Sequence, residues 1–189
     1  MTTIVGIAGS LRRGSYNLML LRAAADIMPE GVSLEIGSIN DIPLYNADVE
    51  AEQGVPAPVQ QLKDRIAAAD GLLIVTPEYN NAMPGVLKNA LDWLSRPPAD
   101  IARVFRSLPT GVIGATPGMG GTILSQASWL PVLRVLGVLP WFEGRVIISG
   151  ANKVFDEGGR IVDAGTVDRL RIYVEGFAAF VQQRRRSRP

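Results

Sequence analysis

The sequence predicts an α/β fold in which one doubly wound, five-stranded parallel sheet forms a single domain. Apolar runs of strand length alternate with segments of helical periodicity, which is the pattern of βαβ units. Several of these runs end in loops rich in glycine, hydroxyl and amide residues. With 189 residues, the chain has the length of one domain and can bury a sizeable core.

The N-terminal part of the chain predicts a strand, a helix and a second strand. The apolar run at residues 3–8 precedes a helix over 17–28, with Asn17 as its expected N-cap and Pro29 beyond its end. A strand over 32–37 alternates apolar and polar residues, which is typical of the edge of a sheet.

The middle of the chain predicts a buried strand between two helices. A polar connection over 40–55 leads to a helix over 58–69, which carries an apolar face. The run at 71–75 is wholly apolar, so it fits a strand that is covered on both faces. A helix is expected over 84–94, with Pro84 in its first turn.

The C-terminal part supplies the last two strands. A strand over 110–115 precedes a helix over 122–136, in which Pro131 is expected to cause a kink or begin a new turn. A strand over 146–149 and a closing helix over 164–183 follow. The domain is therefore expected to span residues 1–183.

The remaining residues, 184–189, form an arginine-rich tail that is expected to be solvated and frayed. No aromatic residue or second basic stretch accompanies it, which argues against nucleic-acid binding. No apolar run is long enough to span a bilayer, and residue 1 is followed directly by a strand pattern. A cytoplasmic protein that binds neither nucleic acid nor a membrane is expected.

Cysteine and histidine are both absent, which restricts the possible chemistry. No disulfide, iron–sulfur cluster, cysteine nucleophile or Ser-His-Asp triad is possible, and zinc and copper sites lose their usual ligands. If the chain is an enzyme, a bound cofactor is expected to supply the difficult chemistry.

The order of the strands decides which loops are neighbours. In the flavodoxin-like order 2-1-3-4-5, the first and third strands are adjacent and the chain reverses its winding between them. Their following loops, residues 9–17 and 76–84, then meet at the carboxyl edge of the sheet. Loop chemistry favours this order, because the two loops suit the two ends of one ligand.

The loop after the first strand has the donors that a phosphate group needs. Ser10 and Ser15 offer hydroxyls, and either Arg12 or Arg13 offers a guanidinium. The free N–H groups at the start of the next helix face the same place. The loop lacks the Walker A lysine and the dinucleotide-binding glycine pattern, and it is also compatible with an ordinary glycine-containing βα turn.

The loop after the third strand suits a planar heterocycle. Its Pro77 favours an extended chain that presents successive N–H and C=O groups to a ring edge. Tyr79 offers a stacking surface, and Glu78 is a weaker candidate for a general base. Trp93 in the next helix is either a core residue or part of a subunit interface.

Two motifs resemble those of the NAD(P)H-dependent FMN reductase family, the flavodoxin-like quinone, chromate and azo-dye reductases. The first is Gly9-Ser-Leu-Arg-Arg-Gly-Ser-Tyr-Asn17, and the second is Thr76-Pro-Glu-Tyr-Asn80 continued by Pro84-Gly-Val-Leu-Lys-Asn-Ala-Leu-Asp-Trp93. The resemblance implies FMN as cofactor. It implies that the first loop contacts the FMN phosphate through Ser10, Arg12, Ser15, Tyr16 and Asn17. The second loop is expected to hold the flavin ring through Pro77, Glu78, Tyr79 and Asn80. A third loop is expected to contact the flavin through Thr116, Gly118 and Gly120.

The same resemblance implies a two-stage reaction. NADPH or NADH passes a hydride to flavin N5, and an acceptor then takes the electrons at the same place. No protein acid or base is strictly required, in agreement with the absence of histidine and cysteine. Family members form dimers or tetramers, for which the helices that carry Trp93 and Trp129 are candidate contact surfaces.

Two other functions remain open at this point. A flavodoxin-type carrier would bind FMN without oxidising a pyridine nucleotide, but such carriers usually have a strongly acidic surface, whereas the net charge here is +1. A metal-dependent hydrolase or phosphotransferase would need an acidic cluster at the end of a strand, which the sequence lacks.

Overall fold

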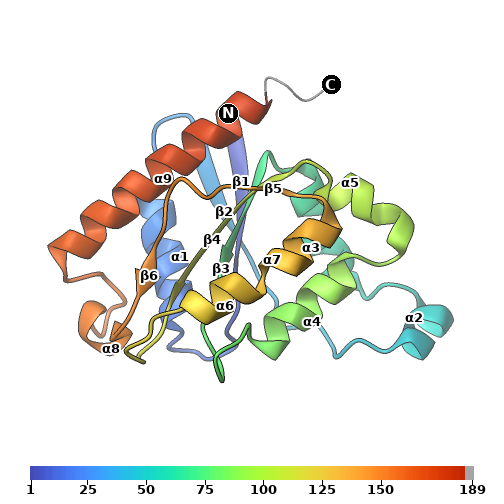
Figure 1. Ribbon diagram of the computed structural model, residues 1–189. Helices are drawn as coiled ribbons and strands as arrows, with labels where there is room; N and C mark the ends of the chain where they lie inside the picture. Colours follow the sequence, from blue (N-terminus) through green and yellow to red (C-terminus); the bar gives the residue numbers. More distant parts are fainter. Residues whose placement is uncertain (186–189) are drawn as a thin grey trace.

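The computed structural model of the chain describes residues 1–185, which fold around one parallel sheet (Figure 1). Hydrogen bonds connect the strands in the order β2-β1-β3-β4-β5, and β6 also pairs with β4. The predicted flavodoxin-like order is therefore confirmed. In the described part of the chain the strands are β1 (Thr2–Ala8), β2 (Val32–Gly37), β3 (Gly71–Val75), β4 (Pro109–Ala115), β5 (Leu139–Pro140) and β6 (Ile147–Ile148).

The fifth position of the sheet is divided between two short strands, which differs from the single strand expected over 146–149. β5 pairs with the start of β4, and β6 pairs with its end, at Gly114 and Ala115. The chain leaves the ladder between the two, where the Trp141 side chain turns into the core. The Trp141 main-chain N–H still donates to the Thr110 carbonyl oxygen of β4 (2.9 Å), and the chain then departs from β4 until β6.

Helices cover both faces of the sheet, as Figure 1 shows. One apolar core lies beneath α1 and α9, and the other lies beneath α3, α4, α5 and α7. The helices over the two faces are α1 (Tyr16–Asp26) and α9 (Ala164–Arg185) on one side, and α3 (Ala57–Ala68), α4 (Gly85–Leu94), α5 (Ile101–Phe105), α6 (Ile123–Ser128) and α7 (Leu130–Leu136) on the other.

Four short helices of the described residues lie in connections in which no helix was expected. They are α2 (Ala47–Gln53), the 3₁₀ helix η1 (Pro98–Asp100), α5 and α8 (Ala151–Val154). The helix expected over 122–136 is divided into α6 and α7 near Pro131, so the expected new turn at the proline is confirmed.

The C-terminal helix ends later than the sequence predicted. α9 continues to Arg185, whose guanidinium donates to the Met1 carbonyl oxygen (2.8 Å) and pairs with Asp70. The first two residues of the predicted tail are thus helical, and its last four, 186–189, lie outside the described residues. Within residues 1–185, no helix combines the length and apolar character needed to cross a membrane.

Both tryptophans proposed to mark contact helices are core residues. Trp93 and Trp129 are each 0% exposed. The indole N–H of Trp93 donates to the Pro43 carbonyl oxygen (2.9 Å), and that of Trp129 donates to Thr76 Oγ1 (3.1 Å). The alternative of Trp93 as an interface residue is therefore wrong, because its ring is enclosed by its own chain.

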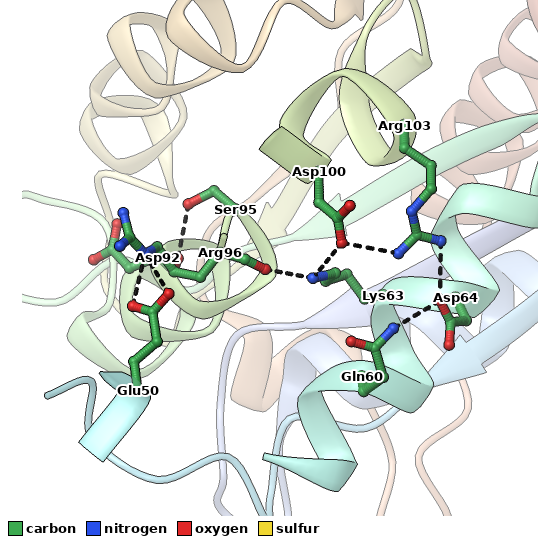
Figure 2. Close-up of polar contacts among 9 residues, drawn as sticks. All are labelled: Glu50, Gln60, Lys63, Asp64, Asp92, Ser95, Arg96, Asp100 and Arg103. Carbon is green, nitrogen blue, oxygen red and sulfur yellow. Dashed lines mark hydrogen bonds and ion pairs between the residues drawn. The ribbon is translucent and has the colours of Figure 1, made fainter. Parts of the chain in front are cut away.

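A polar network connects the helices at one end of the sheet (Figure 2). Lys63 of α3 is fully buried, and its ammonium group pairs with the Asp100 carboxylate (2.8 Å) and donates to the Arg96 carbonyl oxygen. The Arg96 guanidinium in turn pairs with Glu50 of α2 (2.8 Å). A buried ammonium requires such partners, because an uncompensated charge in the interior is costly. The other members are Gln60, Asp64, Asp92, Ser95 and Arg103.

These contacts change the proton affinity of the carboxyl groups. The hydrogen bond from Arg96 holds the pKa of Glu50 below its ordinary value of 4.5. The hydrogen bond from Lys63 likewise lowers the pKa of Asp100 from 3.8. Both cations favour the ionised form of the carboxyl group that they contact.

Acid is expected to weaken this network. A carboxyl group with a lowered pKa in the folded state stabilises the fold above its unfolded pKa, and that contribution is lost as pH falls through the folded pKa. The melting temperature is therefore expected to be level between pH 7 and about 5 and to fall at lower pH. Thermal melts by circular dichroism check this. Glu50→Gln is expected to lower the melting temperature at pH 7 and to reduce its fall in acid, and an unchanged acid profile in that variant would contradict the assignment.

Candidate functional site

Three loops that follow adjacent strands meet at the carboxyl edge of the sheet. We name them the phosphate loop (residues 9–15, after β1), the ring loop (76–84, after β3) and the third loop (116–122, after β4). The Tyr79 hydroxyl bonds to Ser10 Oγ (3.3 Å) and so joins the first two loops. A cavity of about 280 Å³ lies among the three loops and is lined by Ser10, Arg12, Ser15, Tyr16, Asn17, Pro77, Tyr79, Ala115, Thr116 and Pro117.

The phosphate loop ends at the N-terminus of α1. Ser15 is the N-cap, and its hydroxyl oxygen accepts from the Leu18 N–H (3.2 Å). The expectation that Asn17 caps this helix is wrong, because Asn17 lies inside the first turn. The Ser15 hydroxyl proton and the main-chain N–H groups of Tyr16 and Asn17 have no hydrogen-bond partner within the described residues. Unpaired donors at the start of a helix form a site that suits an anion.

Asn17 instead fastens α1 to the sheet. Its side-chain amide donates to the Ala115 carbonyl oxygen (2.8 Å) and accepts from the Ala115 N–H (2.9 Å), and the residue is 3% exposed. The amide thus completes the hydrogen bonding at the end of β4. It keeps the phosphate loop and the third loop at a fixed separation.

Of the two adjacent arginines, the structure brings Arg12 to the cavity. The Arg12 guanidinium lies 4.8 Å above the centre of the Tyr16 ring. The Phe155 ring also lies beside the Tyr16 ring, with its centre 5.9 Å away. Arg13 is exposed and does not line the cavity. A cation–π contact holds Arg12 over the start of α1 without using its N–H donors.

Glycine at position 9 permits the phosphate loop and the ring loop to touch. A Cβ atom at Gly9 would lie 2.6 Å from Leu87 Cδ2 and 3.1 Å from Pro77 Cδ. A larger residue at this position would press on Leu87 of α4 and on Pro77 of the ring loop.

The ring loop is less extended than the sequence predicted. It reverses at Asn80 and Asn81, whose φ angles are 50° and 60°. Tyr79 and Ala82 exchange main-chain hydrogen bonds of 3.1 and 3.0 Å across this turn. The main-chain N–H groups of Glu78 and Asn80 remain without a partner within residues 1–185. The ladder of groups for a ring edge is therefore shorter than expected.

The third loop contributes unequally to the cavity. Thr116 lines it, whereas the exposed Gly118 and Gly120 are not among the lining residues. The Thr116 N–H donates to the Ile148 carbonyl oxygen (2.9 Å), and the Gly118 carbonyl oxygen accepts from the Gly150 N–H (3.2 Å). The end of β6 and the segment after it thus hold this loop through main-chain hydrogen bonds.

Comparison with known proteins gives the family. The profile of the NADPH-dependent FMN reductase family matches residues 2–153. The chain belongs to this family. It is 41% identical, over 96% of both chains, to an NAD(P)H-dependent FMN reductase of Pseudomonas aeruginosa, and 40% identical, over 95% of both chains, to a quinone reductase of Escherichia coli. The structure resembles that of the NAD(P)H:(acceptor) oxidoreductase FerB of Paracoccus denitrificans, with a TM-score of 0.86, 31% identity and coverage of 97% of this chain and 98% of FerB.

Family membership confirms several expectations from the sequence. The chain is an FMN-dependent NAD(P)H oxidoreductase with a flavodoxin-like fold. FMN is its cofactor, and a reduced nicotinamide is its co-substrate. The comparisons offer no support for an electron carrier that does not oxidise pyridine nucleotides.

Sequence reasoning missed Phe155, Ala115 and Pro117 at this site. Phe155 stacks on Tyr16 from more than a hundred residues away, and no local pattern marks it. Ala115 and Pro117 flank Thr116 at the end of β4, and their position at the carboxyl end of a predicted strand was the available signal.

Proposed function

We propose that the chain transfers electrons from NADPH or NADH to a small-molecule acceptor through FMN bound among the three loops. The acceptor class comprises quinones, free flavins, azo compounds and metal oxyanions. The observation that carries this assignment is a cavity with hydroxyl and guanidinium donors at the ends of three adjacent strands, with no carboxylate in its lining. When bound, FMN supplies the redox chemistry, and the chain binds and orients it.

The phosphate loop fits a phosphate group because it offers donors and one positive charge. We assign the phosphate to the hydroxyls of Ser10 and Ser15, the guanidinium of Arg12, and the main-chain N–H groups of Tyr16 and Asn17. A phosphate carries many acceptor oxygens and about two negative charges at neutral pH, so a set made only of donors matches it. The Asn17 side chain contributes indirectly, by holding α1 against Ala115.

The ring loop and the third loop are assigned to the flavin ring. Free main-chain groups at Glu78 and Asn80 can bond to a polar ring edge. Pro77 and the half-exposed Tyr79 ring offer flat contact surfaces. In the third loop, Thr116 offers a hydroxyl from within the cavity, and Gly118 and Gly120 allow close approach of main chain.

Anaerobic reduction tests this function directly. The purified protein is expected to be yellow and to release FMN on denaturation, and NADPH or NADH is expected to bleach it within seconds. A colourless protein that cannot take up FMN would refute the proposal. A yellow protein that neither nucleotide bleaches would instead be an electron carrier.

We also propose that the protein forms a homodimer or homotetramer in the cytoplasm, where reduced nicotinamide is available. Large apolar side chains are exposed on α6, on α7 and in the loop after β5, and a groove of about 300 Å³ lies beside them. Exposed apolar patches of this kind mark association surfaces. Light scattering after size-exclusion chromatography tests the assembly, and a monomer at micromolar concentration would contradict it. The exposed apolar residues include Ile123, Leu124, Leu130, Val135 and Phe142.

A further inference from the structure

The Glu78 side chain caps the N-terminus of α6, although it comes from a distant part of the sequence. Its Oε2 atom accepts hydrogen bonds from the N–H groups of Leu124 (2.9 Å) and Ser125 (3.0 Å). The residue before the helix, Thr122, makes no capping bond with its own side chain. A carboxylate from the ring loop therefore satisfies two N–H groups that the helix itself leaves without partners.

A buried hydroxyl cluster reinforces this connection. Thr76 Oγ1 lies 2.8 Å from Ser125 Oγ, accepts from the Trp129 indole N–H (3.1 Å), and donates to the Pro77 carbonyl oxygen (3.0 Å). Thr76, Ser125 and Trp129 are all 0% exposed. Since buried polar groups are costly when unpaired, this closed set of hydrogen bonds gives the ring loop one defined position against α6.

The far end of the ring loop is attached to the same helix. The Met83 N–H donates to Ser128 Oγ (3.0 Å), and that hydroxyl donates to the Ser125 carbonyl oxygen (2.7 Å). The ring loop is thus held at its start, its middle and its end by one six-residue helix. Because α6 follows the third loop directly, this attachment also sets the distance between the two loops assigned to the flavin ring.

We infer that Glu78 is a positioning residue, whose carboxylate fastens α6 to the ring loop and so fixes the main chain that faces the flavin ring. This inference rests on the proposed FMN site. A general base must reach its substrate, whereas the Glu78 carboxylate is bound through Oε2 to two N–H groups of α6, and Glu78 is not among the residues that line the cavity. The carboxylate also lies at the positive end of α6, where its charge is favourable.

The first test uses FMN-free protein and needs no activity. Hydrogen exchange of the Leu124 and Ser125 amides is followed by NMR in the wild type, Glu78→Ala, Glu78→Gln and the control Glu52→Ala, which changes an exposed residue of α2. Glu78→Ala is expected to speed exchange at both amides roughly tenfold, the effect of one lost charged hydrogen bond. Glu78→Gln keeps a carbonyl oxygen and is expected to retain most of the protection, and Glu52→Ala all of it.

The second test separates positioning from acid–base catalysis. FMN affinity is expected to fall in Glu78→Ala and to recover largely in Glu78→Gln, with the pH dependence of turnover keeping its shape in both. The inference is overturned by the following combined result. Glu78→Ala and Glu78→Gln lose turnover equally, both lose one limb of the pH profile, and the Leu124 and Ser125 amides stay as protected as in the wild type. Failure of the proposed function gives a different pattern, in which amide protection responds as expected but the wild type binds no FMN.

Discussion

Gly114→Ala is expected to destabilise the protein by about 3 kcal/mol and to abolish FMN retention, which is the largest effect that we anticipate for a single methyl group. A Cβ atom at Gly114 would overlap the main-chain oxygen of Thr76 and lie 2.6 Å from Thr122 Oγ1. Main chain cannot rotate away as a flexible side chain can. Thr76 also begins the ring loop, so any relief of the overlap displaces that loop.

The measurement is a thermal melt combined with an FMN titration. For a chain of this length, about 3 kcal/mol corresponds to a fall of roughly 6–12 °C in melting temperature. Gly85→Ala is the matched control, because a Cβ atom at the first residue of α4 meets no atom within 4 Å. That variant is expected to gain about 0.4–1 kcal/mol, as alanine restricts the unfolded chain. If Gly114→Ala melted like the wild type, the close packing of β4 against the ring loop would be wrong.

Much of the fold was predictable because its information is local. A wholly apolar run such as 71–75 fits a strand that is covered on both faces, and β3 is buried at every position. The chemistry of two loops favoured the sheet order, because adjacent loops could hold the two ends of one ligand. The helix break near Pro131 followed from the missing N–H of proline.

The features that escaped prediction depend on partners far along the chain. Asn17 has the residue type of an N-cap, yet it bonds to Ala115, 98 residues away, and Ser15 takes the capping role. Glu78 resembles a candidate base until α6, 46 residues away, is brought to its carboxylate. Such pairings leave no periodic trace in the sequence. Local propensity therefore identified the loops and their residues but not what each side chain contacts.

Arg12→Ala is expected to weaken FMN binding by about 1.5–3 kcal/mol, the scale of a lost charge-assisted hydrogen bond. This corresponds to a rise of roughly 10- to 150-fold in the dissociation constant. The guanidinium lies over the Tyr16 ring at the edge of the cavity, where its N–H groups are available to a phosphate. Titration of the FMN-free protein with FMN, followed by flavin fluorescence, measures the change.

Arg13→Ala is the matched control. It removes the same charge from the neighbouring residue, whose side chain does not line the cavity. The FMN dissociation constant of Arg13→Ala is expected to stay near that of the wild type. The dissociation constant of Arg12→Lys is expected to lie between those of the wild type and Arg12→Ala, because lysine keeps the charge but loses the bidentate geometry of the guanidinium. The effect of Arg12→Ala is expected to shrink as salt is added, because part of it is electrostatic. Equal losses in both alanine variants would mean that the pair acts only through general positive charge. An unchanged affinity in Arg12→Ala would place the phosphate elsewhere on the sheet edge.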